Sequence, residues 1–351
     1  MVKKLPPIDE NYLIDVLTAL LKIPSPTGFT ESAISFVEQT MREFPFLQMR
    51  RTRKGALVAT WPGKKDDAPR GLTAHTDTLG AMVKEIKKNG RLKLSKIGGF
   101  PWDFVEGEGV TVFSQNGKKA RGSVLITQAS VHVYGSKAAE TKREDDTIEV
   151  RIDERTTSAE ETRGLGIEVG DFVVFDPRVE IANGFVRSRH LDDKACVANI
   201  LAAIQSMHRA GLEPAQTTTI LISNYEEVGH GASAGFPENM QELVTVDMAA
   251  VGKGQRSDEF HATLCAKDSG GPYHYGLNQK LRTLAEEYKI PFKVDIYPYY
   301  GSDGEAYWRA GGDVAVALIG PGVDASHNYE RTHTEALAAT TAWILAYLLS
   351  E

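Results

Sequence analysis

Acidic residues and histidines follow several apolar runs of this sequence, each time where the run ends. GLTAHTD ends in His75 and Asp77, which are two residues apart, so on an extended strand both side chains project to the same side. Four other segments carry such groups: TTTILISNYEEVG has Glu226 and Glu227, LVTVDM has Asp247, SRHLDDK has Asp192 and Asp193, and SHNYERTH has His327 and His333. Because open α/β sheets place ligand sites at the carboxyl ends of their strands, we expect these groups to converge.

This set of imidazoles and carboxylates could hold two divalent metal ions, with one carboxylate shared between them. Nitrogen and oxygen ligands suit zinc, cobalt or manganese, and no thiolate is required. Two such ions can acidify a water between them to a pKa of ~7 and polarise a carbonyl group. The Glu226-Glu227 pair could then supply one ligand and one general base. Taken singly, each residue has a simpler explanation as a helix cap, a surface group or a buried hydrogen-bonded histidine, so the prediction depends on their joint occurrence.

The outer parts of the chain alternate between helical and strand-like patterns. The helical patterns cover residues 9–21, 30–41, 192–211, 277–289 and 335–350, and the first of them has a possible cap at Asp9. The strand-like runs cover residues 55–60, 71–75, 217–224, 243–248 and 314–320. Such alternation predicts an α/β fold with a mostly parallel sheet and helices on both faces.

The middle of the chain has a different pattern. Short alternating runs are separated by turns, and the pairs Asn89-Gly90 and Asn116-Gly117 are typical of hairpins. The charged segment KAAETKREDD, residues 137–146, is expected to be a solvated loop. We therefore predict a discontinuous α/β catalytic domain over residues 1–80 and 180–351, and an inserted β-barrel-like domain over residues 81–179.

The composition excludes several classes of protein. The 351 residues include 40 basic and 47 acidic side chains, a net charge of −7 without a basic run, so nucleic acid is not an expected partner. No run approaches the roughly 18 apolar residues that a membrane span needs. MVKKLPPIDE has no apolar stretch after its lysines, and two cysteines form no disulfide framework, so we expect a cytoplasmic protein.

The motifs also resemble a known family. AHTDTLG, SRHLDDKACVA, NYEEVGHGAS, VTVDM and YERTH, in this order, are similar to the motifs of the dinuclear-zinc aminopeptidases. The chain is most similar to the glutamyl or deblocking aminopeptidases that form tetrahedral (TET-type) particles, family forty-two of the metallopeptidases. The resemblance covers most of the chain, including SVHVYG in the insertion, and implies a fold of the zinc-exopeptidase type. DASHNYERTH resembles the branch named after a bacterial osmoprotectant dipeptide system.

The resemblance also implies roles for individual residues. One metal ion would be held by His75, Asp192 and Asp247, and a second by Asp192, Glu227 and His333. Glu226 would be the general base and Asp77 would orient His75. Ser302 and Asp303 would lie near the substrate pocket, and His132 would reach an active site, possibly that of a neighbouring copy. The sequence departs from the family pattern at Thr78, where an acid is common, and after His333, where TEA replaces Ser-Pro.

The implied activity is removal of the N-terminal residue from short peptides, through a water held between two divalent metal ions. The resemblance implies zinc, with cobalt or manganese as alternatives, and a homo-oligomer, possibly a dodecamer, that the insertion helps to build. A deacylase or carboxypeptidase with the same dinuclear site is the nearest alternative, since Arg189 and Arg331 lie near the motifs and could bind a substrate carboxylate. More distant alternatives are a metal-independent glycosidase with paired carboxylates and a non-catalytic metal-binding scaffold.

Overall fold

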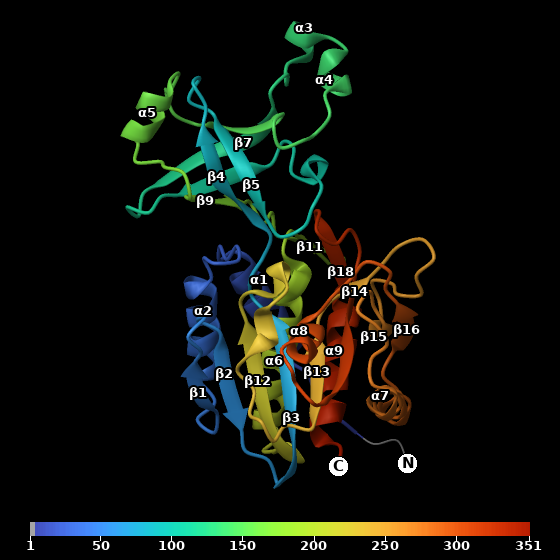
Figure 1. Ribbon diagram of the computed structural model, residues 1–351. Coiled ribbons are helices and arrows are strands. Elements are labelled where there is room, and N and C mark those ends of the chain that lie inside the picture. Colours follow the sequence, from blue (N-terminus) through green and yellow to red (C-terminus); the bar gives the residue numbers. More distant parts are fainter. Residues whose placement is uncertain (1–3) are drawn as a thin grey trace. The chain divides into compact units, whose positions relative to one another are not determined.

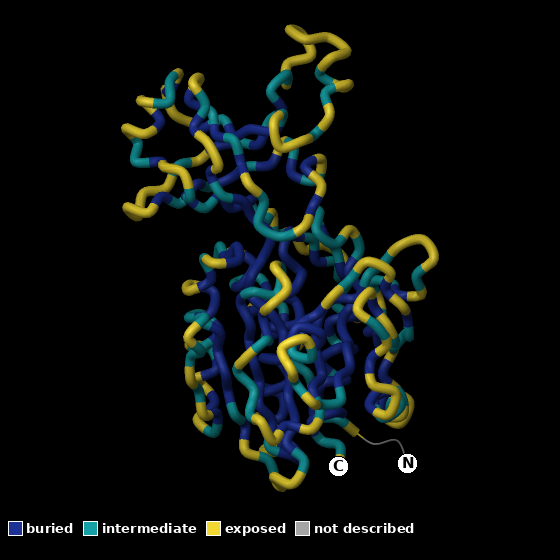
Figure 2. The backbone as a smooth tube through the Cα atoms, in the orientation of Figure 1, coloured by how far each residue is buried: buried dark blue, intermediate teal, exposed yellow. Residues whose placement is uncertain are grey.

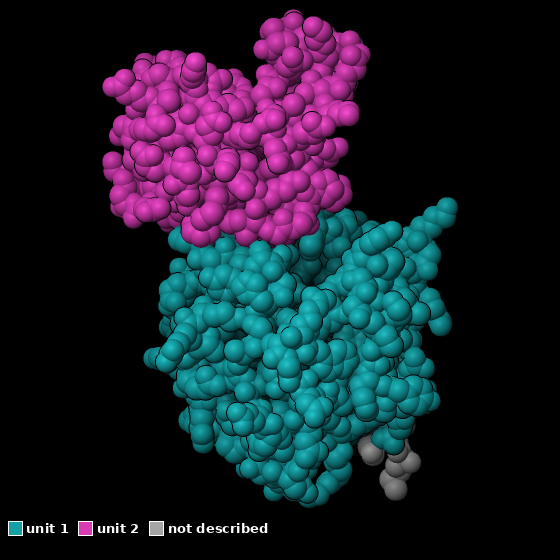
Figure 3. All heavy atoms as spheres, viewed as in Figure 1, with its two compact units in different colours: residues 1–77, 179–351 teal, residues 78–178 magenta. Residues whose placement is uncertain are grey.

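A computed structural model describes residues 4–351; residues 1–3, with which the expected catalytic domain begins, lie outside the described residues. The chain divides into two compact units, coloured separately in Figure 3. We call residues 1–77 and 179–351 the α/β unit, and residues 78–178 the barrel unit. Each unit is described by itself.

The α/β unit is built on one mixed sheet (Figure 1). Its strands lie in the order β1 (Gln48–Arg51), β2 (Leu57–Trp61), β12 (Gln216–Ser223), β3 (Lys65–His75), β13 (Glu242–Val246), β17 (Ala315–Val323), β15 (Ala262–Lys267) and β16 (Phe292–Ile296). The short β14 (Ala249–Ala250) pairs with β17. The central strands β12, β3, β13 and β17 pair in parallel, whereas β1, β2 and β15 join antiparallel. The α/β prediction is confirmed, although the apolar patterns did not indicate β15 and β16.

The central strands of this sheet are buried on both faces. Along β17, Ala317 and Ile319 belong to one apolar core cluster, whereas Val316 and Leu318 belong to another. Because successive side chains of a strand point to opposite faces, a strand covered on both sides reads as one continuous apolar run. Figure 2 shows these strands as buried.

Helices supply the covering layers. The larger core cluster draws its helical residues from α1 (Glu10–Leu21), α2 (Glu31–Met41), α6 (Leu191–Arg209), α7 (Tyr275–Tyr288) and α9 (Thr334–Leu349). The opposite face is covered by α8 (Asp303–Arg309) and the 3₁₀ turn η3 (Gly231–Ser233). Every residue of α6 from Leu191 to Met207 is buried, and Asn199 donates from Nδ2 to the carbonyl of Leu337 in α9 at 2.7 Å. Among residues 4–351, no helix has the length and apolar character that crossing a membrane requires.

The parallel strands end at one edge of the sheet. Strand β3 ends at His75, β12 at Ser223, β13 at Val246 and β17 at Val323. Beside this edge lies a three-stranded sheet that the sequence did not predict, formed by β10 (Glu180–Ala182), β11 (Phe185–Ser188) and β18 (Glu330–His333). Strand β11 leads into α6 and β18 leads into α9, so both helices begin close to the same edge.

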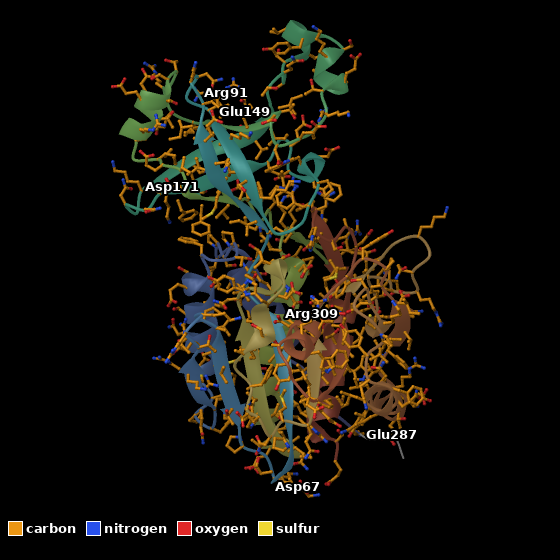
Figure 4. All side chains as sticks on the ribbon, viewed as in Figure 1. Asp67, Arg91, Glu149, Asp171, Glu287 and Arg309 are labelled. Atoms are coloured by element: carbon orange, nitrogen blue, oxygen red, sulfur yellow. The ribbon has the colours of Figure 1, made fainter. Side chains whose placement is uncertain are left out.

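The barrel unit is a closed barrel, which confirms the predicted β-barrel-like insertion. Its strands are β4 (Gly80–Ile86), β5 (Leu92–Ile97), β8 (Ile148–Ile152), β7 (Lys119–Ile126), β6 (Gly109–Phe113) and β9 (Phe172–Phe175), in this order. Gly90 and Gly117 have φ of 79° and 81°, as the two Asn-Gly turns require. Glu149 on β8 is paired with Lys87 at 2.8 Å and with Arg91, which is labelled with it in Figure 4.

Short helical segments interrupt the loops of the barrel unit. They are η1 (Trp102–Phe104), α3 (Val131–Tyr134), α4 (Lys137–Glu140) and α5 (Ala159–Gly164). Helix α4 occupies the start of the segment that was expected to be a loop throughout, and the segment is solvated for most of its length. Helix α5 begins with a capping box in which Ser158 and Glu161 each accept a backbone hydrogen bond.

The close approach of β13 and β17 yields a stability prediction. Asp247 N donates to the carbonyl of Ile319 at 3.0 Å, and a Cβ added at Gly320 would overlap the backbone carbonyl of Asp247. We expect Gly320→Ala to lower the free energy of unfolding by about 1–3 kcal/mol, because the backbone must move to admit the methyl group. Gly252→Ala is the matched control, since nothing lies within 4 Å of its added Cβ. Equal denaturant midpoints for the two variants would contradict this account of the strand contact.

Candidate metal centre

The carboxyl edge of the sheet brings two groups of possible metal ligands together. One ligand atom from each of His75, Asp192 and Asp247 lies within 4.8 Å of the others, and the same holds for Asp192, Glu227 and His327. Asp192 belongs to both groups. The first group is fully buried and the second is partly accessible.

The two oxygens of Asp192 face different histidines. Oδ1 lies 3.1 Å from His75 Nε2, and Oδ2 lies 3.4 Å from His327 Nε2. His327 Nε2 is also 3.6 Å from Glu227 Oε2. One carboxylate with an imidazole on each side is the arrangement that a bridging ligand between two ions requires.

A contact behind the ring orients His75. Its Nδ1 is 2.9 Å from the backbone carbonyl of Asp77, which can only accept, so Nδ1 donates to that carbonyl and Nε2 is the ring nitrogen that faces the site. The Asp77 carboxylate also lies near, with Oδ1 at 3.5 Å from Nδ1. Asp77 therefore orients His75 mainly through its backbone carbonyl and less through its carboxylate.

The Asp77 carboxylate holds the turn that carries both glutamates. Oδ1 accepts from Glu226 N at 3.1 Å, Oδ2 accepts from Glu227 N at 3.2 Å, and Thr27 Oγ1 donates to Oδ2 at 2.6 Å. These bonds support the 3₁₀ turn η2 (Glu226–Val228) directly after β12. The turn places Glu227 in the second ligand group and Glu226 Oε2 at 3.7 Å from His75 Nε2. Neighbours on an extended strand would point to opposite sides, so the turn allows both to face the site.

The pKa shifts of the buried acids show that the centre lacks compensating positive charge from the described residues. Burial, together with the charge of Asp192, raises the pKa of Asp247 to about 7, and burial raises that of Glu227 to about 8. Burial also raises the pKa of Glu226 well above its usual range. For Asp192 burial acts in the same direction, but hydrogen bonds from His327 and His75 outweigh it and lower the pKa.

These residues fit divalent metal ions. Buried carboxylates are costly in their charged form unless cations or hydrogen bonds compensate them. Two divalent ions, one at each ligand group, would supply that compensation. The donors are all imidazole nitrogens and carboxylate oxygens, a set that suits zinc, cobalt or manganese.

His333, the histidine that the family resemblance assigned to the second ion, lies outside both groups. It caps α9, with Nδ1 accepting from Glu335 N at 3.2 Å, and its ring packs edge-on against Phe185 at 4.9 Å between ring centres. Gly184 leaves room for this ring, because a Cβ there would collide with Nε2. Nδ1 is thus engaged as the helix cap, and the structure brings His327, rather than His333, to the two ligand groups.

The proposed substrate residues lie in buried networks. Asp303 is 1% exposed; its Oδ1 accepts from Ala232 N at 2.8 Å, and its Oδ2 accepts from the hydroxyls of Ser223 and Thr73. It thus ties the ends of β12 and β3 to η3, below the turn that carries the glutamates. Ser302 Oγ is 2.7 Å from the Tyr273 hydroxyl.

Two of the residues named from the sequence lie in the barrel unit. His132 is exposed on α3, and the buried Thr78 donates to the carbonyl of Leu79 at 3.1 Å. Two further residues support the candidate ligands. Asp193, which was expected to converge with them but was given no role of its own, accepts from His75 N at 3.2 Å. Glu330, which sequence reasoning missed, accepts from the main chain of two candidate ligands.

A family model and several named relatives match most of this chain. A family model described as M42 glutamyl aminopeptidase matches residues 55–342. A Bacillus subtilis (strain 168) protein named "Putative aminopeptidase YhfE" is 47% identical over 338 residues, covering 96% of this chain and 97% of its own. The glutamyl aminopeptidase of Lactococcus lactis subsp. cremoris (strain MG1363) is 26% identical and covers 88% of this chain and 87% of its own.

Solved structures show the same fold. The TET1 peptidase of Pyrococcus horikoshii, which can assemble into a tetrahedron or a large octahedral shell, has a TM-score of 0.82 at 23% identity. That alignment covers 97% of this chain and all of the other. The aminopeptidase APDkam598 from the archaeon Desulfurococcus kamchatkensis has a TM-score of 0.86 at 20% identity, covering 97% and 95% of the two chains.

The two histidines of SHNYERTH can be distinguished by mutation. We expect His327→Ala to reduce bound metal by about one ion per chain, because it removes a donor that faces Asp192 and Glu227. His333→Ala should retain its metal and lose about 0.5–2 kcal/mol of stability, since it removes a helix cap. Metal content by elemental analysis and thermal unfolding would measure both effects. Loss of metal in His333→Ala, with retention in His327→Ala, would reverse the assignment.

Proposed function

The chain belongs to the M42 glutamyl aminopeptidase family, and from that premise we propose how its metal centre removes the N-terminal residue of short peptides. The chain is a metal-dependent aminopeptidase, a hydrolase that acts on peptide bonds. The observation that carries the proposed mechanism is the pair of ligand groups that share Asp192, with Glu226 beside them.

The ligands divide between two ions. His75 and Asp247 would hold the first, Glu227 and His327 the second, and Asp192 would bridge them. The nitrogen and oxygen donors support zinc, with cobalt or manganese as alternatives. When bound, the two ions would acidify a water between them and polarise the scissile carbonyl group.

Glu226 moves the proton in this mechanism. Its carboxylate takes a proton from the attacking water and returns it to the departing amine, so it acts first as a general base and then as a general acid. Burial raises its pKa, which makes it a better proton acceptor than an exposed glutamate. Asp77 contributes by holding the main chain of the turn, so that Glu226 stays on the side of the site that faces the water.

The arginines near the motifs do not support the carboxypeptidase or deacylase alternative. Such an enzyme must bind a substrate carboxylate, usually through a guanidinium group. Arg331 pairs with Glu259 at 2.5 Å and lies over the ring of Phe185, and Arg189 donates to the carbonyl of Asn328 at 3.2 Å. Both side chains are thus engaged within the protein. Family membership likewise favours the aminopeptidase over the glycosidase and scaffold alternatives.

We also propose a cytoplasmic homo-oligomer with a shell-like form, for which a dodecamer is the candidate assembly. The relative from Pyrococcus horikoshii assembles into such shells, and the chain aligns with it over nearly its whole length, the barrel unit included. The barrel unit is our candidate for the contacts between copies. Both cysteines, Cys196 and Cys265, are free and buried, which suits a reducing compartment.

Chelation and one substitution test the mechanism. We expect a chelator to abolish hydrolysis of aminoacyl anilides and zinc, cobalt or manganese to restore it. Glu226→Gln should keep both ions and lose about 10²–10⁴-fold in kcat, because an amide cannot accept the proton of the water. Full activity of a verified metal-free protein would contradict the proposed mechanism.

A paired substrate serves as the control in this test. N-acyl amino acids present the same amide bond with a free carboxylate and a blocked amine. The proposed aminopeptidase should cleave the anilide and leave the N-acyl substrate intact, whereas the opposite preference would restore the deacylase alternative.

The oligomeric state is tested separately by light scattering of the full chain. The proposed shell predicts a mass near twelve times the chain mass of 38.4 kDa. A smaller closed assembly would keep the homo-oligomer and remove the dodecamer, and a monomeric mass would remove both.

A further inference from the structure

The carboxylate of Glu330 is bonded to the main chain of two metal-ligand candidates. Its Oε2 accepts from Asp192 N at 3.0 Å, and its Oε1 accepts from His327 N at 2.9 Å. Asp192 is the shared ligand and His327 belongs to the second group. Glu330 itself is 2% exposed, so water does not compete for these bonds.

The segments that Glu330 joins are distant in the sequence. Asp192 lies 138 residues before it, at the start of α6, whereas His327 lies in the loop between β17 and β18. Glu330 is the first residue of β18 and lies opposite Ser188 of β11, the strand that leads toward α6. One side chain therefore spans the junction between the two ligand-bearing segments.

The loop that carries His327 depends on such an anchor. It is closed by backbone bonds between Asp324 and Arg331, and His327 has a left-handed φ of 64°, which is unfavourable for a side chain larger than glycine. The bond from His327 N to Glu330 compensates for this conformation. It also sets the position of the His327 ring relative to Asp192.

We propose that Glu330 is a positioning residue that spaces His327 against Asp192 and thereby forms the second metal site; this inference rests on the proposed function. Glu330 is not a ligand in either group, because both of its oxygens are turned toward backbone N–H groups. An ionised carboxylate offers two acceptor oxygens and no donor. A glutamine at this position would direct its NH₂ group at one of the two N–H groups and lose that bond.

Cobalt titration of the full chain tests this role, with the cobalt absorption spectrum reporting each site. We expect Glu330→Gln to weaken binding of the second ion by about 10–100-fold, as loss of a group behind a ligand typically does, while binding of the first ion changes less than threefold. Glu335→Gln is the matched control, because it is the same substitution five residues further along the chain. The Glu335 side chain is 68% exposed and belongs to neither ligand group. It should bind both ions as the wild type does.

Each outcome decides a different point. If Glu330→Gln binds both ions with wild-type affinity and spectrum, the positioning role is wrong although the proposed function stands. Equal weakening of both ions together with a changed circular dichroism spectrum would show a general structural role and would also overturn it. If the wild-type chain binds no metal, the proposed function itself fails. Should Glu330→Gln not fold, Glu330→Asp replaces it, since its shorter side chain cannot reach both N–H groups, and the same selective loss is expected.

Discussion

The concentration of buried negative charge around Asp192 is the constraint on which the rest of the site depends. Asp192, Asp247, Glu226 and Glu227 meet at one edge of the sheet with only two imidazoles among them. Burial raises the pKa of three of these four acids, which means that their charged forms are unfavourable in the folded protein. Bound cations would stabilise those charged forms. This unfavourable concentration of negative charge is what makes the cluster a candidate site for divalent ions.

The surrounding structure meets that constraint through hydrogen bonds from the main chain. Asp77 holds the turn of the two glutamates, Asp303 holds the η3 turn below it, and Glu330 holds the segments of Asp192 and His327. In each case a buried carboxylate accepts backbone N–H groups at a point where regular pairing has ended. The side chains proposed to bind metal ions are thus distinct from those that fix the geometry of the turns.

Much of the fold and part of the site could be predicted from the sequence. The apolar runs indicated β3, β12, β13 and β17, because strands buried on both faces carry apolar residues without interruption. His75, Asp247 and the Glu226-Glu227 pair could be named because each lies at or shortly after the end of one of these strands, and the family resemblance then assigned Glu227 as the ligand. Strand β15 carries only a short run, ATLCA, that sequence reasoning did not use, and β16 alternates between apolar and charged residues. The sheet of β10, β11 and β18 consists of short strands that are stable only through tertiary contacts.

The order of residue types along the chain thus determined a mostly parallel sheet whose carboxyl edge carries imidazoles and carboxylates, since periodicity and burial are local properties. The choice between His327 and His333 was decided only by the tertiary structure. Both histidines lie in one short segment, and the pairing of β18 with β11 places His333 at the cap of α9, against Phe185, while the loop before it turns His327 toward Asp192. Glu330 acts across 138 residues, and such a contact exists only once the sheet and α6 have come together.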